Sequence, residues 1–550
     1  MDPGCVCGTP CLAPCVDPEP TLKREASHDC NEAQRNTVAR SLAQEWENVT
    51  VLAADSSAPH TERTVARQWV APVVVATLSA LLLYIVEIAL RAILPLDRLF
   101  EGYRFQAWSS NWVMQTIGLE DMIAFGPKSL WLMHVYPPGL DAIRYLLSLP
   151  NIGQDITVIQ PTVDLRLYML YCGLFGVLNA LVYVWLRDLL GRSTSRWWAV
   201  GGTVLWAIYP GNLMVATLLE GSQLSLITVA FAYYFLYRFC RTRRVGYATA
   251  FLAATLVASM TRSVVQTHVL VILLVAAVVL WWLARNRRWW WLIGNLALVV
   301  LMAVIPAKNL VLYGSFTPST FGGYHRVGML FLDPMTVPAP VYPEQLETNA
   351  LAFSSRYNTR EVAKDNFRLE SGANAFIREH PYEALRGMGA SLKVTIPEAL
   401  RPTSEYVTNP LVESMPWTSA YNWVFSGWRY LLLLAGAAAV IILSRGWRGT
   451  GRLIRRYGWF IVFWGLIAFP VIFSNRYRPG EEPAGAVWTD AMRLKIFLEI
   501  PVYVGLVYAA WTLVDALRRR RQQGRELGAV AGPVGALAND ATREGSALSS

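Results

Sequence analysis

The chain has 550 residues, of which 54% are hydrophobic and only 16% charged, and its mean hydropathy is +0.32. This composition is too apolar for a soluble enzyme with a single core, and it predicts a polytopic membrane protein. The net charge of +10 does not require nucleic acid as a partner, because the basic residues gather in short loops that favour one side of a membrane and its anionic lipids.

The chain begins with a segment that we expect to be a disordered cytoplasmic tail. Residues 1–68 are rich in Pro, Ser, Asp and Glu and lack helical periodicity. Five of the seven cysteines lie in this tail, namely Cys5, Cys7, Cys11, Cys15 and Cys30. Their spacing does not match a standard zinc finger and no well-placed histidine follows, so we expect neither a metal site nor a cofactor here.

About ten apolar stretches follow, each long enough to cross roughly 30 Å of hydrocarbon as a helix. They run over residues 70–94, 166–187, 197–216, 222–240, 246–262, 264–284, 289–306, 428–444, 458–474 and 494–516. The predicted fold class is therefore an all-α polytopic bundle. Cys172 and Cys240 fall inside these stretches, where we expect them to behave as small hydrophobic residues.

Basic clusters follow the second, fourth, sixth and eighth stretches and return after the last one. Because Lys and Arg in short loops stay on the cytoplasmic side, both termini are predicted to be cytoplasmic. The long connections at 95–165 and 307–427 should then face outward from the plasma membrane.

This topology divides the chain into five parts. They are a tail (1–68), a transmembrane core (69–306) that includes the first outer loop (95–165), an outer helical cap loop (307–427), C-terminal transmembrane helices (428–517) and a second disordered tail (518–550).

The first outer loop is predicted to form helices that lie in the membrane interface. Near its start Phe105, Trp108 and Trp112 recur at spacings of three and four residues, as on one face of a helix. A second helix can open at Pro138.

In that second helix the side chains separate by chemistry. Leu140, Ile143 and Leu147 fall on one side, while Asp141, Arg144 and Tyr145 turn elsewhere. We expect these polar residues to be presented at the level of the lipid headgroups.

Ionisable residues gather at the predicted outer ends of the spans, whereas a transporter would concentrate them near the bilayer midplane. The ionisable residues at these outer ends are Glu101, Asp121, Asp141, Glu220, Arg262, His268, Lys308 and His325. A carboxylate and several cations at the headgroup level suit transfer of a sugar from a lipid phosphate. The carboxylate would take a proton from the acceptor hydroxyl, and the cations would hold the departing phosphate.

Five segments, taken in order, are FEGYRFQAWSSNWVMQ, HVYPPGLDAIRYLL, MTRS, PAKNLVLYGSFTPSTFGGYH and DAMRLKIFLEIP. They resemble motifs of the GT-C superfamily of polyprenyl-phosphate-sugar-dependent glycosyltransferases, especially the protein O-mannosyltransferase and aminoarabinose-transferase branch. The resemblance covers most of residues 69–517. It implies a GT-C-like bundle whose active site faces the outer side of the membrane. In such a bundle the first outer loop (95–165) carries catalytic residues.

By this resemblance Glu101 is the candidate general base, with Asp97 and Asp121 as alternates. The implied contacts to the donor phosphate are Arg262, Lys308 and Arg493, and the implied acceptor side holds Tyr136, Asp141 and His325. The chain departs from the family pattern in three places. The acidic pair is reduced to Phe100-Glu101, Lys308 replaces the usual arginine, and His325 stands where asparagine is common.

Plainer interpretations of these residues stay open. Glu101 is also suited to capping the start of a helix, where acids are favoured. Arg262 is suited to snorkelling to the outer interface, and Lys308 and Arg493 to anchoring the ends of spans. His325 is equally suited to an ordinary hydrogen-bonding role.

The outer segment 307–427 is predicted to be a small helical cap that covers the site. Its helical pattern places Phe376, Ala384, Leu385 and Met388 on one apolar stripe.

The predicted function is inverting transfer of a sugar from a polyprenyl-phosphate donor to a lipid, glycan or protein acceptor. The sequence has no Gly-rich nucleotide cradle in a βα unit, which argues against a soluble nucleotide-sugar as the donor. Two alternatives from other classes are a lipid or glycan transporter (flippase) and a non-catalytic protein of envelope assembly. Membrane lipids are the further partners that we expect.

Overall fold

The computed structural model describes residues 61–93, 110, 116–191, 196–262, 267–348, 358–405, 412–413, 415–473, 475–476, 488–489 and 491–547. For some of them, including 87–93, 267–268, 493 and 524–547, only the backbone is described. The chain divides into two compact units, residues 1–71 and 72–550, and the account below concerns the second.

The elements in chain order are α2 (Thr61–Ile93), α4 (Leu119–Phe125), α5 (Pro127–Leu132), α6 (Gly139–Ser148), η2 (Leu149–Asn151), α7 (Ile156–Leu190), α8 (Arg196–Ala207), α9 (Pro210–Thr217), α10 (Gly221–Thr242), α11 (Val245–Thr261), α12 (Thr267–Leu283), α13 (Trp289–Met302), α14 (Val304–Tyr313), α15 (Gly322–Leu330), η3 (Pro334–Thr336), α16 (Glu344–Thr348), α17 (Arg360–Glu379), α18 (Pro381–Ala399), η4 (Thr403–Glu405), α20 (Thr418–Val424), α21 (Gly427–Ile472), β1 (Asn475–Arg476), β2 (Trp488–Thr489), α22 (Ala491–Leu494) and α23 (Ile496–Ala547).

Helix is by far the dominant structure of the described residues, so the all-α class is confirmed in its coarse form. The exception is the short antiparallel pair of β1 and β2, in which Asn475 lies opposite Thr489.

Several helices are long and apolar enough to span a membrane, which identifies a membrane protein by length and composition. In the described part of the chain five helices qualify, or six if the bent pair of α8 and α9 counts as one span. The five are Trp69–Val86, Ile156–Leu190, Trp289–Tyr313, Gly427–Phe469 and Ile496–Gln523. Each stretch predicted from the sequence is mostly helical where the structure describes it, with non-helical residues at several ends and breaks, and α11 and α12 are shorter than a usual span.

Helix α10 lies at the centre of the bundle. It packs against α7, α11, α21 and α23, and most of its side chains are buried. A helix that is apolar on all sides has no solvent face to present, so a central position is the arrangement that its sequence favours.

Two breaks in helices mark the path of the chain, one at a predicted connection and one inside a predicted span. In α21 Gly446 has φ 67° and ψ 166°, so the helix bends there, at the basic connection between two predicted spans. Pro210 begins α9 after a bend of 54° from α8. A proline lacks the N–H that would continue the preceding helix, which explains why residues 197–216 form two helices and not one.

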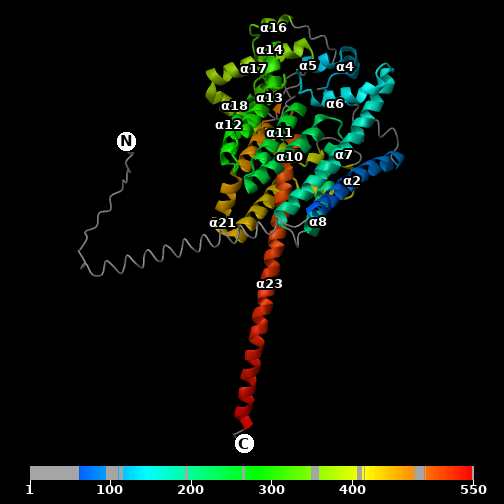
Figure 1. The fold of residues 1–550 in the computed structure, drawn as a ribbon. Coiled ribbons are helices and arrows are strands. Elements are labelled where there is room, and N and C mark those ends of the chain that lie inside the picture. Colours follow the sequence, from blue (N-terminus) through cyan, green and yellow to red (C-terminus); the bar gives the residue numbers. More distant parts are fainter. Residues whose placement is uncertain are drawn as a thin grey trace, which may run out of the picture. The chain divides into compact units, whose positions relative to one another are not determined.

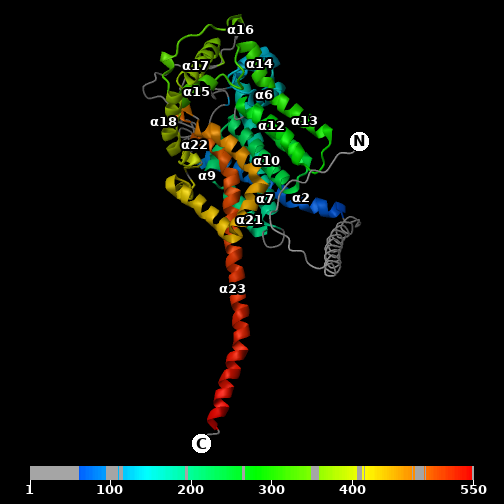
Figure 2. The same ribbon diagram turned by 90° about the vertical axis from the view of Figure 1, so that its left-hand side faces the viewer.

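Figures 1 and 2 show which elements share an end of the bundle. Helices α4, α5, α6 and α14 to α17 lie at one end, which we call the cap end. The bend of α21 lies toward the opposite end, where α7 and α10 also finish. We call this the arginine end, after the side chains that gather there.

The cap has a small core of its own, formed by α15, α17 and α18. Ala384 is buried in it, and Phe376 and Met388 pack against it, as predicted. Leu385 is 67% exposed, so its predicted place on the same stripe is wrong. The reason is that Ala384 and Met388 stand four residues apart on one face of α18, whereas Leu385 is turned by about 100° from Ala384 around the helix axis.

The C-terminal segment also differs from its prediction. Helix α23 continues through Ala547, so residues 518–547 are helical where we expected a disordered tail. The segment contains six Ala and six Arg, which are strong helix formers, along with five Gly and one Pro, and it extends a helix that already exists and needs no new nucleus.

Candidate functional site

Three residues predicted for the site line one small cavity near the cap end. Tyr136 and Asp141 come from one segment and Arg262 from another, and Glu220 joins them there. The whole lining is Thr116, Met133, Tyr136, Pro137, Leu140, Asp141, Glu220, Gly221, Thr261 and Arg262. The cavity therefore lies where the starts of α6 and α10 meet the end of α11.

Two glycines permit this meeting of three helices. A Cβ atom on Gly139 would lie 2.4 Å from the carbonyl oxygen of Met260, and one on Gly221 would lie 2.8 Å from that of Thr261. Only glycine allows such close approach of backbones. The starts of α6 and α10 thus pack directly on the backbone that presents Arg262.

Arg262 is the central cation of the cavity, and its side chain is buried within the protein. Its Nη1 lies 3.6 Å from Glu220 Oε1 and donates a hydrogen bond to the Ser222 hydroxyl, which in turn donates to Glu220. Snorkelling to the interface therefore does not describe this side chain. Both contacts use Nη1, and a guanidinium carries further N–H donors.

Two aromatic rings lie near this ion pair. The guanidinium carbon of Arg262 is 6.0 Å from the ring centroids of both Tyr136 and Phe497. The backbone carbonyl of Glu220 accepts a hydrogen bond of 2.6 Å from the Tyr171 hydroxyl. The cation is thus fixed in an apolar frame, in which charge interactions are stronger than in water.

Asp141 and Arg144 form a second buried ion pair beside the cavity. Arg144 Nη1 lies 2.6 Å from Asp141 Oδ1 and donates to the carbonyl oxygen of Ile117 at 2.8 Å, while Nε donates to the Ser110 hydroxyl at 2.8 Å. Burial raises the pKa of Asp141, although the Arg144 charge opposes that shift.

This pair corrects the prediction that Asp141 and Arg144 are presented at the headgroup level. Their side chains are 1% and 0% exposed, and the outward residue of α6 is Leu146. The spacing separated the two faces of the helix correctly. It did not show that the polar face turns inward, because the partners at Ser110 and Ile117 satisfy the charge only in the folded chain.

The segment before α6 is held from α14 and the loop after it. Lys308 Nζ donates to the carbonyl oxygen of Met133, the Tyr313 hydroxyl donates to that of Leu132 at 2.5 Å, and the Ser319 hydroxyl donates to that of Val135. The two segments are far apart in the chain but share a row of hydrogen bonds. The two prolines of VYPPG thus follow a backbone stretch that these hydrogen bonds hold in position.

His134 lies inside the same junction. Its backbone N–H donates to Asn358 Oδ1 at 2.8 Å, and its ring Nδ1 lies 2.6 Å from the Thr320 hydroxyl. Burial, and secondarily the positive charge of Lys308, lowers the pKa of His134 to about 3. The ring is therefore neutral at physiological pH.

The remaining predicted residues lie outside the cavity lining. Lys308 reaches its edge, since Met133 lines the cavity and accepts the Lys308 hydrogen bond. His325 is half-buried in α15 of the cap, and Asp121 is half-buried in the first turn of α4.

Three predicted site residues cannot be placed with their side chains. Glu101 and Asp97 lie outside the described residues, and Arg493 lies in α22, of which the backbone is described there. Their assigned roles remain predictions.

A third buried charged pair at the start of α23 was missed at the sequence level. Lys495 Nζ lies 3.6 Å from Glu499 Oε1, and both residues are buried. Glu499 accepts hydrogen bonds from Tyr209 (2.9 Å) and Thr403 (3.1 Å). The signal was present in KIFLE, where two opposite charges stand four residues apart at the start of an apolar span.

Within the described ranges no group of three or more His, Cys, Asp and Glu side chains is placed to hold a metal ion. No protein-family model matches the chain, and no curated protein or solved structure matches it either. A proposal about function therefore rests on the sequence and on the geometry of the site.

Proposed function

We propose that the protein is a membrane glycosyltransferase of GT-C type that moves a sugar from a polyprenyl-phosphate donor to an acceptor on the outer face of the membrane. The observation that carries this proposal is a convergence of segments around Arg262. Tyr136 and Phe497, which belong to two other motif segments, stack beside it. Lys308, from a third, holds Met133 at the cavity edge.

Such a convergence is what a site for a lipid phosphate requires. The segments are remote in sequence, and nothing in their individual helical patterns demands that they meet. A buried arginine with aromatic walls offers a charge-assisted hydrogen bond to an anion in surroundings that exclude water. The adjacent Glu220 keeps the cation neutralised until an anion competes for it.

In the proposed reaction the acceptor oxygen attacks the anomeric carbon of the sugar in a single inverting displacement. The bond from that carbon to the phosphate oxygen breaks, and polyprenyl phosphate leaves. Glu101 accepts the proton of the acceptor hydroxyl, with Asp97 and Asp121 as alternates. Arg262, with Lys308 and Arg493, holds the phosphate as its charge develops, while Tyr136, Asp141 and His325 shape the acceptor side.

An apolar groove supports a donor that is carried by lipid. It has a volume of about 760 Å³ and lies between α8, α21 and α23, where Leu205, Leu433 and Val440 line it. Phe425 also lines it and packs against Tyr209, whose hydroxyl donates to Glu499 of the buried Lys495–Glu499 pair. An isoprenoid chain in this groove would remain in hydrocarbon surroundings while its phosphate lies at the cap end.

The topology belongs to the same proposal. It has about ten membrane-spanning helices, cytoplasmic termini and an outward cap end, as the positive-inside rule favours. A transporter or flippase is the main alternative, and it would need ionisable groups along a path through the midplane. The buried pairs around Arg262 and Lys495 instead lie at helix ends.

The test is transfer by the purified full chain. A panel of radiolabelled polyprenyl-phosphate sugars is offered together with membrane extracts as acceptors. We expect one donor to be consumed, with the label recovered in a new product of inverted anomeric configuration. Glu101→Gln should lower that rate by roughly 10²–10⁴-fold, because general-base catalysis contributes about this much.

Asp121→Asn serves as the matched control for the base. Loss of activity in this variant with normal activity in Glu101→Gln would move the base and leave the reaction class standing. A folded protein that consumes no polyprenyl-phosphate sugar in the panel, but moves such lipids between the leaflets of a vesicle, would replace the proposal by the transporter.

A further inference from the structure

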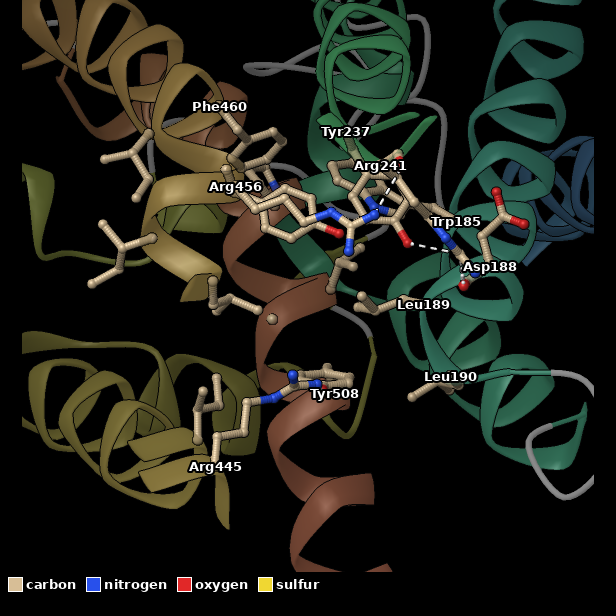
Figure 3. A pocket seen from close by; sticks show the side chains of 18 of the residues that line it. Trp185, Asp188, Leu189, Leu190, Tyr237, Arg241, Arg445, Arg456, Phe460 and Tyr508 are labelled. Atoms are coloured by element: carbon tan, nitrogen blue, oxygen red, sulfur yellow. Dashed lines mark hydrogen bonds between the residues drawn. The ribbon is translucent and has the colours of Figure 1, made fainter. Parts of the chain in front are cut away.

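A second cavity, of about 830 Å³, lies at the arginine end and has no part in the proposed transfer. Its walls come from α7, α10, α21 and α23, as Figure 3 shows. Four arginines line it, namely Arg241, Arg445, Arg452 and Arg456, together with a single carboxylate, that of Asp188. The lining therefore has an excess of three positive charges.

The one carboxylate is already committed elsewhere. Asp188 Oδ2 accepts a hydrogen bond of 2.9 Å from the Tyr234 hydroxyl and forms an ion pair with Arg238. The charge of Asp188 is thus balanced by Arg238, which does not line the cavity. The positive charges of the four lining arginines are therefore not balanced by Asp188.

Three of these four arginines are positioned by neutral partners. Arg456 Nη2 donates to the carbonyl oxygen of Arg241 at 2.8 Å, and Arg241 Nη1 donates to that of Asp188 at 2.5 Å. Arg445 donates to the Tyr508 hydroxyl, and Figure 3 shows this pair farther along α23 than Arg241 and Arg456. Among the residues that the structure describes, no carboxylate lies within ion-pair distance of Arg445, Arg452 or Arg456.

The floor of the cavity is apolar. Leu189, Leu190, Ile441, Phe460, Pro501 and Val504 line it. The four arginines themselves are exposed, so they are open to a ligand, and an anion bound among them would offset part of their mutual repulsion.

We propose that this cavity binds an anionic phospholipid, with the phosphate held by Arg241, Arg445, Arg452 and Arg456 and the adjoining hydrocarbon on the apolar floor. A planar guanidinium matches a phosphate with two parallel hydrogen bonds. Free phosphate would satisfy the arginines but would leave the apolar floor uncovered. Basic pockets between membrane helices are typical sites for the headgroups of anionic lipids.

The inference does not depend on the proposed sugar transfer, and its test does not measure transfer. Purified full chain is titrated with dioctanoyl phosphatidylglycerol, and the bound lipid is measured by native mass spectrometry. Dioctanoyl phosphatidylcholine and inorganic phosphate are the comparison ligands. We expect phosphatidylglycerol to bind, phosphatidylcholine to bind more weakly, and inorganic phosphate not to displace the lipid at equal concentration.

Two variants locate the site. The triple variant R445Q/R452Q/R456Q should weaken binding of phosphatidylglycerol by about tenfold or more, since it removes several charge-assisted hydrogen bonds. Gly505→Phe should do the same without changing any charge. A Cβ atom on Gly505 meets no atom within 4 Å, and Gly505 lines the cavity, so the phenyl ring would occupy the lipid's place.

The matched control is R518Q/R519Q/R520Q, which removes as many charges from α23 outside the cavity. We expect it to bind the lipid normally. Equal losses in the control and in the cavity variant would mean diffuse attraction to a basic surface and would overturn the site. Normal binding by Gly505→Phe, or displacement of the lipid by inorganic phosphate, would overturn the lipid assignment.

Discussion

Arg144 illustrates how the buried charges of the cap end depend on one another. Its guanidinium binds Asp141 Oδ1, the carbonyl oxygen of Ile117 and the Ser110 hydroxyl, and it has no exposed surface. Each of these acceptors loses a hydrogen bond if the guanidinium is removed. A buried pair of this kind contributes little net stability while intact, but it is costly to break on one side.

We therefore predict that Arg144→Met destabilises the protein by about 3–5 kcal/mol, because Asp141 is left as an uncompensated buried charge. The double variant D141N/R144M should lose clearly less than the two single variants combined. The measurement is the free energy of unfolding in mixed detergent micelles, arranged as a double-mutant cycle. Strictly additive losses would show that the pair is not coupled.

His134 is predicted to make stability depend on pH. Its folded pKa, about 3, lies below the usual 6.5, because burial disfavours the charged ring. The unfolded chain binds the proton first as pH falls, so the stabilisation is complete above pH 6.5 and is lost toward pH 3, by about 1.4 kcal/mol per pH unit.

The control for this prediction is His134→Asn, which retains a polar atom near the position of Nδ1. The difference in unfolding free energy between the wild-type protein and this variant should shrink as pH falls from about 6.5, the ordinary histidine pKa. A difference that stays constant across this range would mean that the ring is not held neutral.

At the scale of elements, periodicity and proline placed the helices well but did not show which face turns inward. Pro138 precedes α6 and Gly446 interrupts α21 where the sequence indicated a helix start and a break. The inward face of α6 is polar, and hydrophobic periodicity assigns polar faces to the outside. The direction of a charged face is set by partners from other elements, which a local pattern does not contain.

The contact between α6 and α11 supplies a prediction at this scale. Gly139→Ala would bring a Cβ atom to 2.4 Å from the carbonyl oxygen of Met260, so α6 has to shift away from the end of α11. We expect a lower melting temperature in detergent and, if the proposed function holds, weaker donor binding, because Arg262 follows that end.

Gly173→Ala is the matched control. Gly173 lies inside α7, and a Cβ atom there meets nothing within 4 Å. Alanine should stabilise this helix by roughly 0.5–1 kcal/mol relative to glycine. Equal effects of the two substitutions would contradict the close packing of α6 on α11.

For the whole molecule, the sequence predicted a helical membrane protein but could not pair its segments. Lys308 meets Met133 and Arg262 meets Phe497 across long stretches of chain. Such contacts depend on how helices pack, and no spacing within one segment encodes them. The hydrogen-bond donors to Glu499, which are Tyr209 and Thr403, likewise come from other elements, so KIFLE indicates the charged pair but not its surroundings.

The orientation of the whole molecule is open to a direct check. In a background without its seven cysteines, a single cysteine replaces either Tyr382 in the cap or Trp447 beside the bend of α21, and both positions are well exposed. A membrane-impermeant maleimide should label Tyr382→Cys in intact cells and Trp447→Cys only after permeabilisation. The reverse pattern would invert the proposed topology.

The most direct test of the account is sugar transfer by Arg262→Gln in reconstituted vesicles, measured with the donor that the wild-type protein consumes. We predict that the rate falls by roughly 10²–10³-fold, because an interaction with charge developing in the transition state is lost. The control is Arg429→Gln, whose arginine stacks on Trp423 and Trp428 away from the cavity, and it should transfer normally. A folded Arg262→Gln protein that transfers sugar at the wild-type rate would contradict the role of this cavity as the site of the donor phosphate.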